Sequence, residues 1–97
     1  MYVGVVFYKF RRSRIPEAVR CWEEMVINEA KRQQGYIKAE MFVNEETGEG
    51  IDIGFWETKE DAQRFQDTGL FDLLRQCLTE YMTEPPRREQ FKLVTSV

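Results

Sequence analysis

The 97-residue sequence contains no histidine and only two cysteines. Without histidine, the common forms of the serine and cysteine catalytic triads and most zinc or iron ligand sets are excluded. No CxxC pair or Cys/His metal spacing occurs, so we predict neither a metal site nor a bound cofactor. Glycine-rich nucleotide loops are missing too, because Gly48 and Gly50 fall in a predicted hairpin and not between a strand and a helix.

Long apolar runs and clustered charge are also absent. No run approaches the roughly 18–20 residues of a membrane span, and no basic leader follows Met1, so we expect a cytoplasmic protein without a membrane partner. The net charge is −3, with the two signs interleaved, whereas nucleic-acid-binding proteins carry a basic patch. The nearest such patch, residues 11–14, is either a solvated loop or a site for an anionic group of a ligand. We expect no nucleic-acid partner.

The two cysteines, Cys21 and Cys77, each fall on or beside the apolar stripe of a predicted helix. Helices that share a sheet face could bring them near each other. Free cysteine behaves as a small hydrophobe, and disulfides are rare in reducing compartments. We therefore expect two buried, unpaired cysteines.

The remaining pattern predicts the order strand, helix, strand, strand, helix, strand. A first strand at residues 2–10 is apolar on both faces, and a helix begins at Ser13 or Ile15 and stops before Gly35. Thr58 is a predicted N-cap of the second helix, with a kink or break near Gly69. A double proline at positions 85 and 86 ends the helical region, and a last strand covers residues 90–97.

This order predicts the fold class. Right-handed crossovers place four strands in one antiparallel sheet with both helices on one face. We therefore predict an α+β protein with the ferredoxin-like βαββαβ sandwich fold, formed as a single domain by residues 1–97.

The central hairpin joins strands at residues 36–43 and 51–57 through a polar loop. If Val43 pairs with Ile51, the odd-numbered residues of both strands share one face, and a one-residue bulge would reverse half of the assignment. The odd face is uniformly apolar and should pack on the helices: Ile37, Ala39, Met41, Val43, Ile51, Ile53 and Phe55. The even face is mixed: Tyr36, Lys38, Glu40, Phe42, Asp52, Gly54 and Trp56.

The helices can cover only one face of the sheet, and aromatic side chains gather on the other. At roughly 150–250 Å² each, they amount to on the order of 1,000 Å². Monomers rarely expose an apolar patch above about 300–600 Å², so we predict a homodimer packed sheet against sheet through this open face. The aromatic residues expected there are Tyr2, Tyr8, Phe10, Tyr36, Phe42 and Trp56.

Several short motifs support a family resemblance. Residues 35–37 (GYI) start the second strand, ETGEG precedes the third, FWET ends it, and residues 60–62 (EDA) open the next helix. With this element order, nearly the whole chain resembles the antibiotic biosynthesis monooxygenase-like (ABM) members of the dimeric α/β-barrel superfamily. The resemblance implies paired sheets, and either cofactor-free oxygenation of aromatic polyketides or quinols, or haem degradation. Members often carry a histidine where this chain has Phe65 and Gln66, which argues against haem degradation.

Candidate catalytic residues come from carboxylates and aromatics. Trp56 is either a core or interface aromatic or a pocket wall that stacks a planar substrate, and Lys38, expected opposite it, could fix its ring by a cation–π contact. Glu40 and Asp52 could serve as a general base if desolvation raises the pKa, or could pair with Lys or Arg at an interface rim.

Further aromatics are expected in a pocket or interface: Tyr8, Trp22, Tyr36, Phe42 and Trp56. A cavity between helices and sheet would be lined by side chains that otherwise belong to the core: Trp22, Phe65, Phe71 and Tyr81. We therefore expect a cofactor-free monooxygenase that acts on a small phenol or hydroquinone. The alternative is a non-catalytic dimeric domain that binds a small aromatic or apolar ligand or has a structural role.

Overall fold

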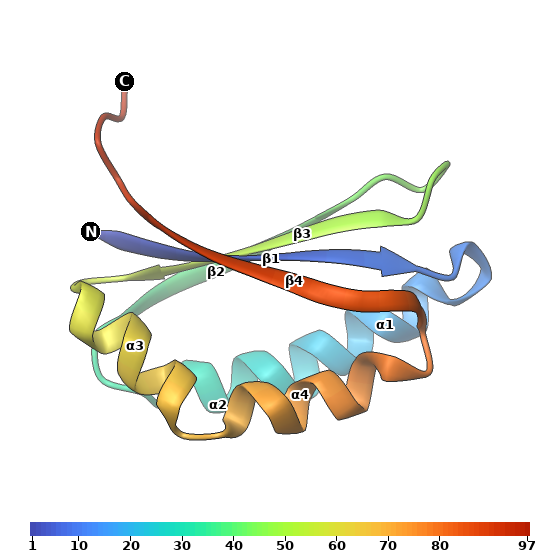
Figure 1. Ribbon diagram of the computed structural model, residues 1–97, viewed down its shortest axis with the longest axis horizontal. Coiled ribbons are helices and arrows are strands. Elements are labelled where there is room, and N and C mark those ends of the chain that lie inside the picture. Colours follow the sequence, from blue (N-terminus) through green and yellow to red (C-terminus); the bar gives the residue numbers. More distant parts are fainter.

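Four antiparallel strands form one sheet, and all helices lie on one side of it (Figure 1). The computed structural model covers residues 1–97 and describes every side chain except those of residues 70, 71 and 73–75. In spatial order the strands are β2 (Tyr36–Val43), β3 (Glu49–Trp56), β1 (Tyr2–Phe10) and β4 (Met82–Lys92). The predicted βαββαβ order and ferredoxin-like fold are confirmed.

The first crossover is one continuous helical tract with a π-helical centre. A 3₁₀ turn, η1 (Arg12–Arg14), leads into α1 (Ile15–Cys21), and the helix continues through η2 (Trp22–Ile27) and α2 (Asn28–Ala30). Pro16 lies in the first turn, where its missing N–H is harmless. The π-helical segment was not predicted. Such segments are often found at functional sites, and this one begins at Trp22.

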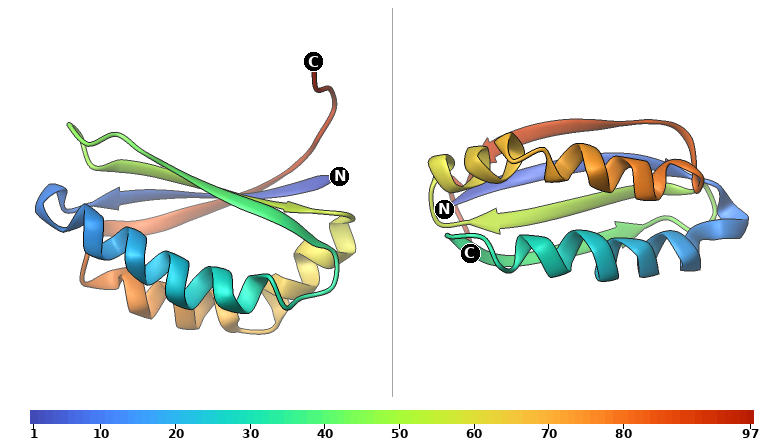
Figure 2. Two further views of the ribbon diagram at one scale, coloured as in Figure 1. Left: turned by 180° about the vertical axis from the view of Figure 1, so that it is seen from behind. Right: turned by 90° about the horizontal axis from the view of Figure 1, so that it is seen from below.

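The second crossover is broken where the sequence predicts a break. Helices α3 (Lys59–Asp67) and α4 (Leu70–Thr79) are separated at Gly69, which has a φ of 80°. Thr58 caps α3 as predicted, because its hydroxyl accepts a hydrogen bond from the Asp61 N–H at 3.1 Å. Figure 2 shows the two helical tracts side by side beneath the sheet. Among the described residues, no helix has the length and apolar character that a membrane crossing requires.

The predicted register of the hairpin is wrong by one residue. Val43 pairs with Gly50 and not with Ile51, because β3 already begins at Glu49. Odd positions of β2 therefore share a face with even positions of β3. Ala39, Met41 and Val43 face the helices as predicted. On β3, however, that side carries Gly50, Asp52, Gly54 and Trp56.

The predicted set of open-face aromatics is corrected by the same register. Tyr8 and Phe10 of β1 belong to the core, at 7% and 1% exposure. Tyr36 also turns toward the helices, because the register shifts by one residue between Tyr36 and Lys38. Trp56 is 4% exposed, and Tyr2 pairs with it across the strands on the same side. Only Phe42 of the predicted set lies on the open face.

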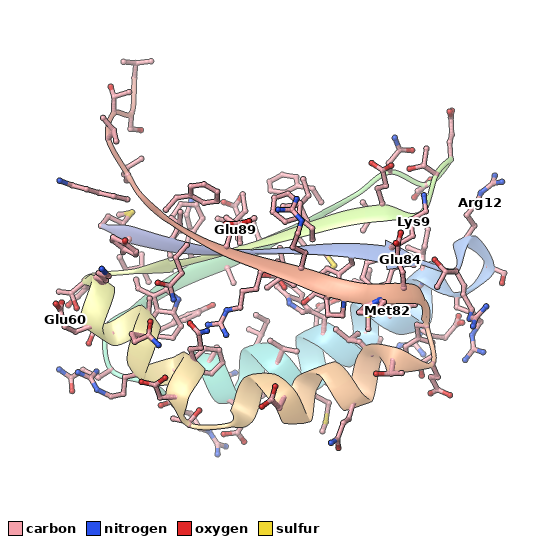
Figure 3. All side chains as sticks on the ribbon, in the orientation of Figure 1. Lys9, Arg12, Glu60, Met82, Glu84 and Glu89 are labelled. Atoms are coloured by element: carbon pink, nitrogen blue, oxygen red, sulfur yellow. A yellow bond between two sulfur atoms is a disulfide. The ribbon has the colours of Figure 1, made fainter. Side chains whose placement is uncertain are left out.

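The open face is nevertheless apolar. We define it by eight side chains on the side without helices: Val3, Val5, Phe7, Phe42, Ile51, Ile53, Phe55 and Phe91. Phe42 is 54% exposed and Phe91 is 49% exposed. Charged side chains also lie on this side, including Glu89 (Figure 3). The hairpin tip and the C-terminal end both extend on this side of the sheet (Figure 1).

The last strand begins earlier than predicted. β4 runs from Met82 to Lys92, includes both prolines and ends before residues 93–97. Its pairing with β1 shifts between Arg87 and Glu84, so the prolines fall in an irregularity of an edge strand. Proline is tolerated there because no ladder hydrogen bond is lost.

The cysteines are paired, contrary to the prediction. Cys21 of α1 and Cys77 of α4 form a disulfide with Cα atoms 6.7 Å apart, and both residues are only half-buried. Their helices pack against each other beneath the sheet, which brings the two stripes together. The core between helices and sheet contains Val6, Tyr8, Phe10, Ala18, Trp22, Leu78 and Met82.

Candidate active site

A cavity lies between the sheet and the helices. Its volume is about 60 Å³. A cavity must offer at least about 10–15 Å³ to hold one water, so this space is large enough for more than one. Aromatic side chains from both layers line it: Tyr8, Trp22, Tyr36, Trp56 and Phe65. Phe42, predicted to join them, lies across the sheet and borders a separate, wide groove on the open face.

Asp52 is a buried carboxylate in this cavity, with 9% exposure. Its Oδ2 accepts a hydrogen bond from the Tyr8 hydroxyl at 2.6 Å and another from Trp22 Nε1 at 3.2 Å. Burial raises the pKa of Asp52 to about 6, although both hydrogen bonds and the positive charge of Arg88 act in the opposite direction. Asp52 can therefore gain or lose a proton close to neutral pH.

One oxygen of Asp52 remains open to the cavity. Both hydrogen bonds end on Oδ2. Within the described part of the chain, no fully enclosed side-chain nitrogen or oxygen lacks a partner, so Oδ1 borders the free space. By the same argument, Trp56 Nε1 also borders the free space. It lies over Gly54, 3.3 Å from the position that a Cβ on that glycine would occupy. The cavity thus presents an acceptor from Asp52 and a donor from Trp56, beside the polar groups of Tyr36, Arg88 and Gln90.

Neighbouring rings hold Trp56 in place. Tyr36 meets it edge-on at 5.8 Å, and Phe65 packs against it at 5.2 Å. Lys38 was predicted opposite Trp56, but the true register places its ammonium group over the ring of Phe55, at 4.7 Å, on the open face. The orientation of Trp56 therefore comes from aromatic packing.

Glu40 does not share a face with Asp52, which corrects the prediction. The shifted register places Glu40 on the open face, where its carboxylate pairs with the Lys38 ammonium at 3.4 Å. Pairing with Lys or Arg was the alternative that the sequence left open for this carboxylate, and Lys38 is such a partner. Asp52 is thus the one of the two predicted carboxylates that lines the cavity.

Tyr8 and Arg88 complete the surroundings of Asp52. Burial raises the pKa of Tyr8 well above its usual value, and the charge of Asp52 adds to this, so Tyr8 remains a donor. Arg88 of β4 is half-buried and lines the cavity, and burial lowers its pKa while Asp52 opposes that shift. Arg88 was missed because the last strand was predicted to begin at residue 90. The correct strand bounds would have placed it beside Val6 and Asp52.

Of the other residues predicted to line the cavity, some do so and some lie elsewhere. Trp22 and Phe65 line the cavity. Tyr81 lies elsewhere, under the guanidinium of Arg14 at 4.9 Å, and the side chain of Phe71 is outside those described. Among the side chains that are described, no group of three acidic, cysteine or histidine residues could hold a metal ion. The cavity suits a planar ligand with an ionisable hydroxyl, because aromatic walls surround one acid–base group.

No protein-family model matches the sequence, and no curated protein is similar to it. Solved structures are similar in fold. A monooxygenase from the gene ActVA-Orf6 of Streptomyces coelicolor, in complex with nanaomycin D, has a TM-score of 0.84 at 15% identity over 99% of this chain and 89% of that one. SnoaB, a cofactor-independent oxygenase from Streptomyces nogalater, has a TM-score of 0.79 at 12% identity, covering 99% and 95%. A Bordetella bronchiseptica protein named as an antibiotic biosynthesis monooxygenase has 0.80 at 16%, covering 97% of each chain.

Proposed function

We propose that this chain, which has the fold of antibiotic biosynthesis monooxygenase structures, is a cofactor-free monooxygenase of a small phenol or hydroquinone. The observation that carries the proposal is Asp52, a carboxylate enclosed among aromatic rings with one oxygen open to the cavity. Two proteins of similar fold are named as a monooxygenase and a cofactor-independent oxygenase, which supports the reaction class.

In this proposal Asp52 is the general base. Its Oδ1 takes the phenolic proton, and the N–H of Trp56 donates a hydrogen bond to a substrate oxygen in the same cavity. A phenol has a pKa near 10, so a base with an ordinary Asp pKa of about 3.9 would face a difference of roughly 6 units. Burial raises the pKa of Asp52 to about 6, which reduces that difference by about 2 units, or roughly 3 kcal/mol.

The phenolate then reduces O₂. A hydroquinone with a free ring position and one O₂ give a hydroxyquinone and one water. One oxygen atom enters the ring in place of a hydrogen, and the other leaves as water. The substrate supplies all the electrons, so the protein's tasks are to form the anion, orient it and exclude water from it.

Oxygen uptake with a panel of hydroquinones tests the proposal. We expect protein-dependent uptake, and a Trp56→Phe variant should retain the fold but lower kcat by at least about tenfold, because an aromatic ring remains while the N–H donor is lost. Unchanged turnover would remove Trp56 from the mechanism. No uptake with any member of the panel would favour the non-catalytic alternative.

We further propose that two copies associate through the open face. Its eight side chains are largely aromatic or β-branched, and standard interfaces bury about 800 Å² per partner. Two cations on the same side lie over its rings: the Arg87 guanidinium is 4.2 Å from the centre of the Phe7 ring, and the Lys38 ammonium is 4.7 Å from that of Phe55.

A Phe42→Glu variant tests this association. Light scattering at micromolar concentration should give the mass of two chains for the wild type and of one chain for the variant, because a carboxylate would be buried at the interface. Met25→Glu is the matched control. Met25 is 48% exposed, close to the 54% of Phe42, but belongs to the helical layer, so this variant should remain dimeric. A monomeric wild type would contradict the proposal.

A further inference from the structure

The helical wall of the cavity comes from two separate tracts, and a covalent bond joins them. Trp22 of η2 belongs to the first tract, and Leu78 belongs to α4 of the second. The two tracts lie side by side beneath the sheet (Figure 2). The chain has only two cysteines, so the bond between Cys21 and Cys77 is the single disulfide that its sequence permits.

Each half of this disulfide is followed directly by a residue of the cavity wall. Cys21 precedes Trp22, which is buried and donates a hydrogen bond from Nε1 to the Asp52 carboxylate at 3.2 Å. Cys77 precedes Leu78, which is buried in the core. The disulfide therefore ties α4 to the part of the first tract that holds the buried carboxylate.

The position of the disulfide also suits exchange with thiols. Both cysteines are only half-buried, although the residues that follow them are enclosed. Exchange requires that a thiolate reach one of the two sulfur atoms. In reducing compartments disulfides are usually transient or redox-sensing. The segment after Cys21 is π-helical, and such segments are frequent at functional sites. These features fit a bond that is made and broken in the folded protein.

We propose that Cys21–Cys77 is a thiol-exchange site, and that its reduction by a dithiol opens the cavity at Trp22. One thiolate of the dithiol attacks a sulfur of the bond and forms a mixed disulfide, which the second thiol of the dithiol resolves. The protein gains two electrons and two protons as two thiols, and the dithiol leaves as an intramolecular disulfide. Without the bond, the two tracts separate locally while the sheet stays folded.

Acrylamide quenching of tryptophan fluorescence tests the proposal. The chain has two tryptophans, so a Trp56→Phe variant leaves Trp22 as the only one. Trp22 is 6% exposed while the disulfide is intact. Dithiothreitol should raise its quenching constant at least about threefold, because local opening admits the quencher, and should leave the far-UV circular dichroism unchanged. Thiol titration in denaturant should find no thiol in protein purified without reductant and two after treatment.

A serine variant is the control for the reductant itself. Cys21→Ser and Cys77→Ser together, in the Trp56→Phe background, remove the bond permanently. This variant should show the higher quenching constant both with and without dithiothreitol.

Trp22→Phe is the control for general loosening. It leaves Trp56, which packs on Tyr36 and on Phe65 of α3, a helix that the disulfide does not join. Reduction should change the quenching constant of Trp56 less than about 1.5-fold, since the opening is local.

Three results would overturn the proposal at the level of the bond: two thiols in the untreated protein, unfolding on reduction, or an unchanged quenching constant of Trp22. The disulfide would then be absent or would serve stability alone. Equal rises at Trp22 and Trp56 would overturn it too, because the whole protein would have loosened.

The effect on turnover rests on the proposed function. Opening admits water to Asp52, so the serine variant with Trp56 intact should lose oxygen uptake with a hydroquinone at least about tenfold. Uptake equal to that of the wild type would overturn this regulation. If the quenching of Trp22 changes as expected but no hydroquinone supports uptake by the wild type, the exchange site stands and the monooxygenase proposal fails.

Discussion

Replacing Asp52 by Asn should lower turnover of a hydroquinone substrate at least about 100-fold and, at pH 8, make the protein more stable. A positioned general base contributes roughly 10²–10⁴-fold to rate, and an amide cannot accept the phenolic proton. An Asn side chain has nearly the same shape, so Tyr8 and Trp22 can still donate to its oxygen. The loss of rate should therefore come from chemistry, with the cavity intact.

The gain in stability follows from the direction of the pKa shift. Burial raises the pKa of Asp52 to about 6, above the roughly 3.9 of an unfolded chain. The folded state thus binds this proton more tightly, and above pH 6 the group opposes folding by about 3 kcal/mol. That penalty disappears as the pH falls from 6 to about 4. The variant should gain about 1–3 kcal/mol at pH 8, reduced by the loss of a charge near Arg88, and nothing at pH 4.

Urea unfolding at the two pH values, together with oxygen uptake between pH 5 and 8, measures both effects. The rate of the wild type should rise with pH through about 6, as Asp52 ionises. Glu40→Gln is the control, because Glu40 is an exposed carboxylate of the same sheet, paired with Lys38 outside the cavity. It should change neither rate nor stability. A wild-type rate in the Asp52 variant would exclude this residue as the base.

Local signals in the sequence were sufficient for most of the fold. The cap at Thr58, the break at Gly69 and the helix start near Pro16 each depend on neighbouring residues, and each is where the pattern predicts it. Which face of β3 turns toward the helices depends on whether the hairpin loop is one residue shorter or longer, and neighbouring residues do not determine that length. Alternation places the apolar set Ile51, Ile53 and Phe55 inside, whereas the structure turns Asp52 and Gly54 inward.

The candidate site is where the binary pattern fails. A buried carboxylate beside two cross-strand glycines is unfavourable for packing, and such violations are expected at functional sites. Asp52 was identified as a candidate from its residue type, but its partners Tyr8 and Trp22 come from another strand and from a helix. Their meeting depends on the long-range register, as does the pairing of Cys21 with Cys77.

Gly35→Ala should be among the most destabilising single substitutions in the chain, at about 2–5 kcal/mol. Gly35 has a φ of 83°, which costs other residues roughly 1–2 kcal/mol. An added Cβ would also fall on the carboxylate of Asp61, which is 5% exposed and held by Arg64 at 2.7 Å. Overpacking of this kind adds about 1–3 kcal/mol or more. The Gly35 carbonyl also accepts the Glu57 N–H at 2.9 Å, so the shift reaches the end of β3.

Gly69→Ala separates the two contributions. Gly69 has nearly the same φ, 80°, but a Cβ there would meet nothing within 4 Å, so only the backbone cost of about 1–2 kcal/mol should appear in urea unfolding. Adding Asp61→Gly to Gly35→Ala should restore part of the loss, since it removes the carboxylate that the methyl group meets. Equal losses at Gly35 and Gly69 would show that the contact with Asp61 contributes nothing. A larger loss at Gly35 would show that its close contact with Asp61 holds the start of α3 against the start of β2. This contact lies next to Tyr36 and Trp56, which form part of the cavity wall.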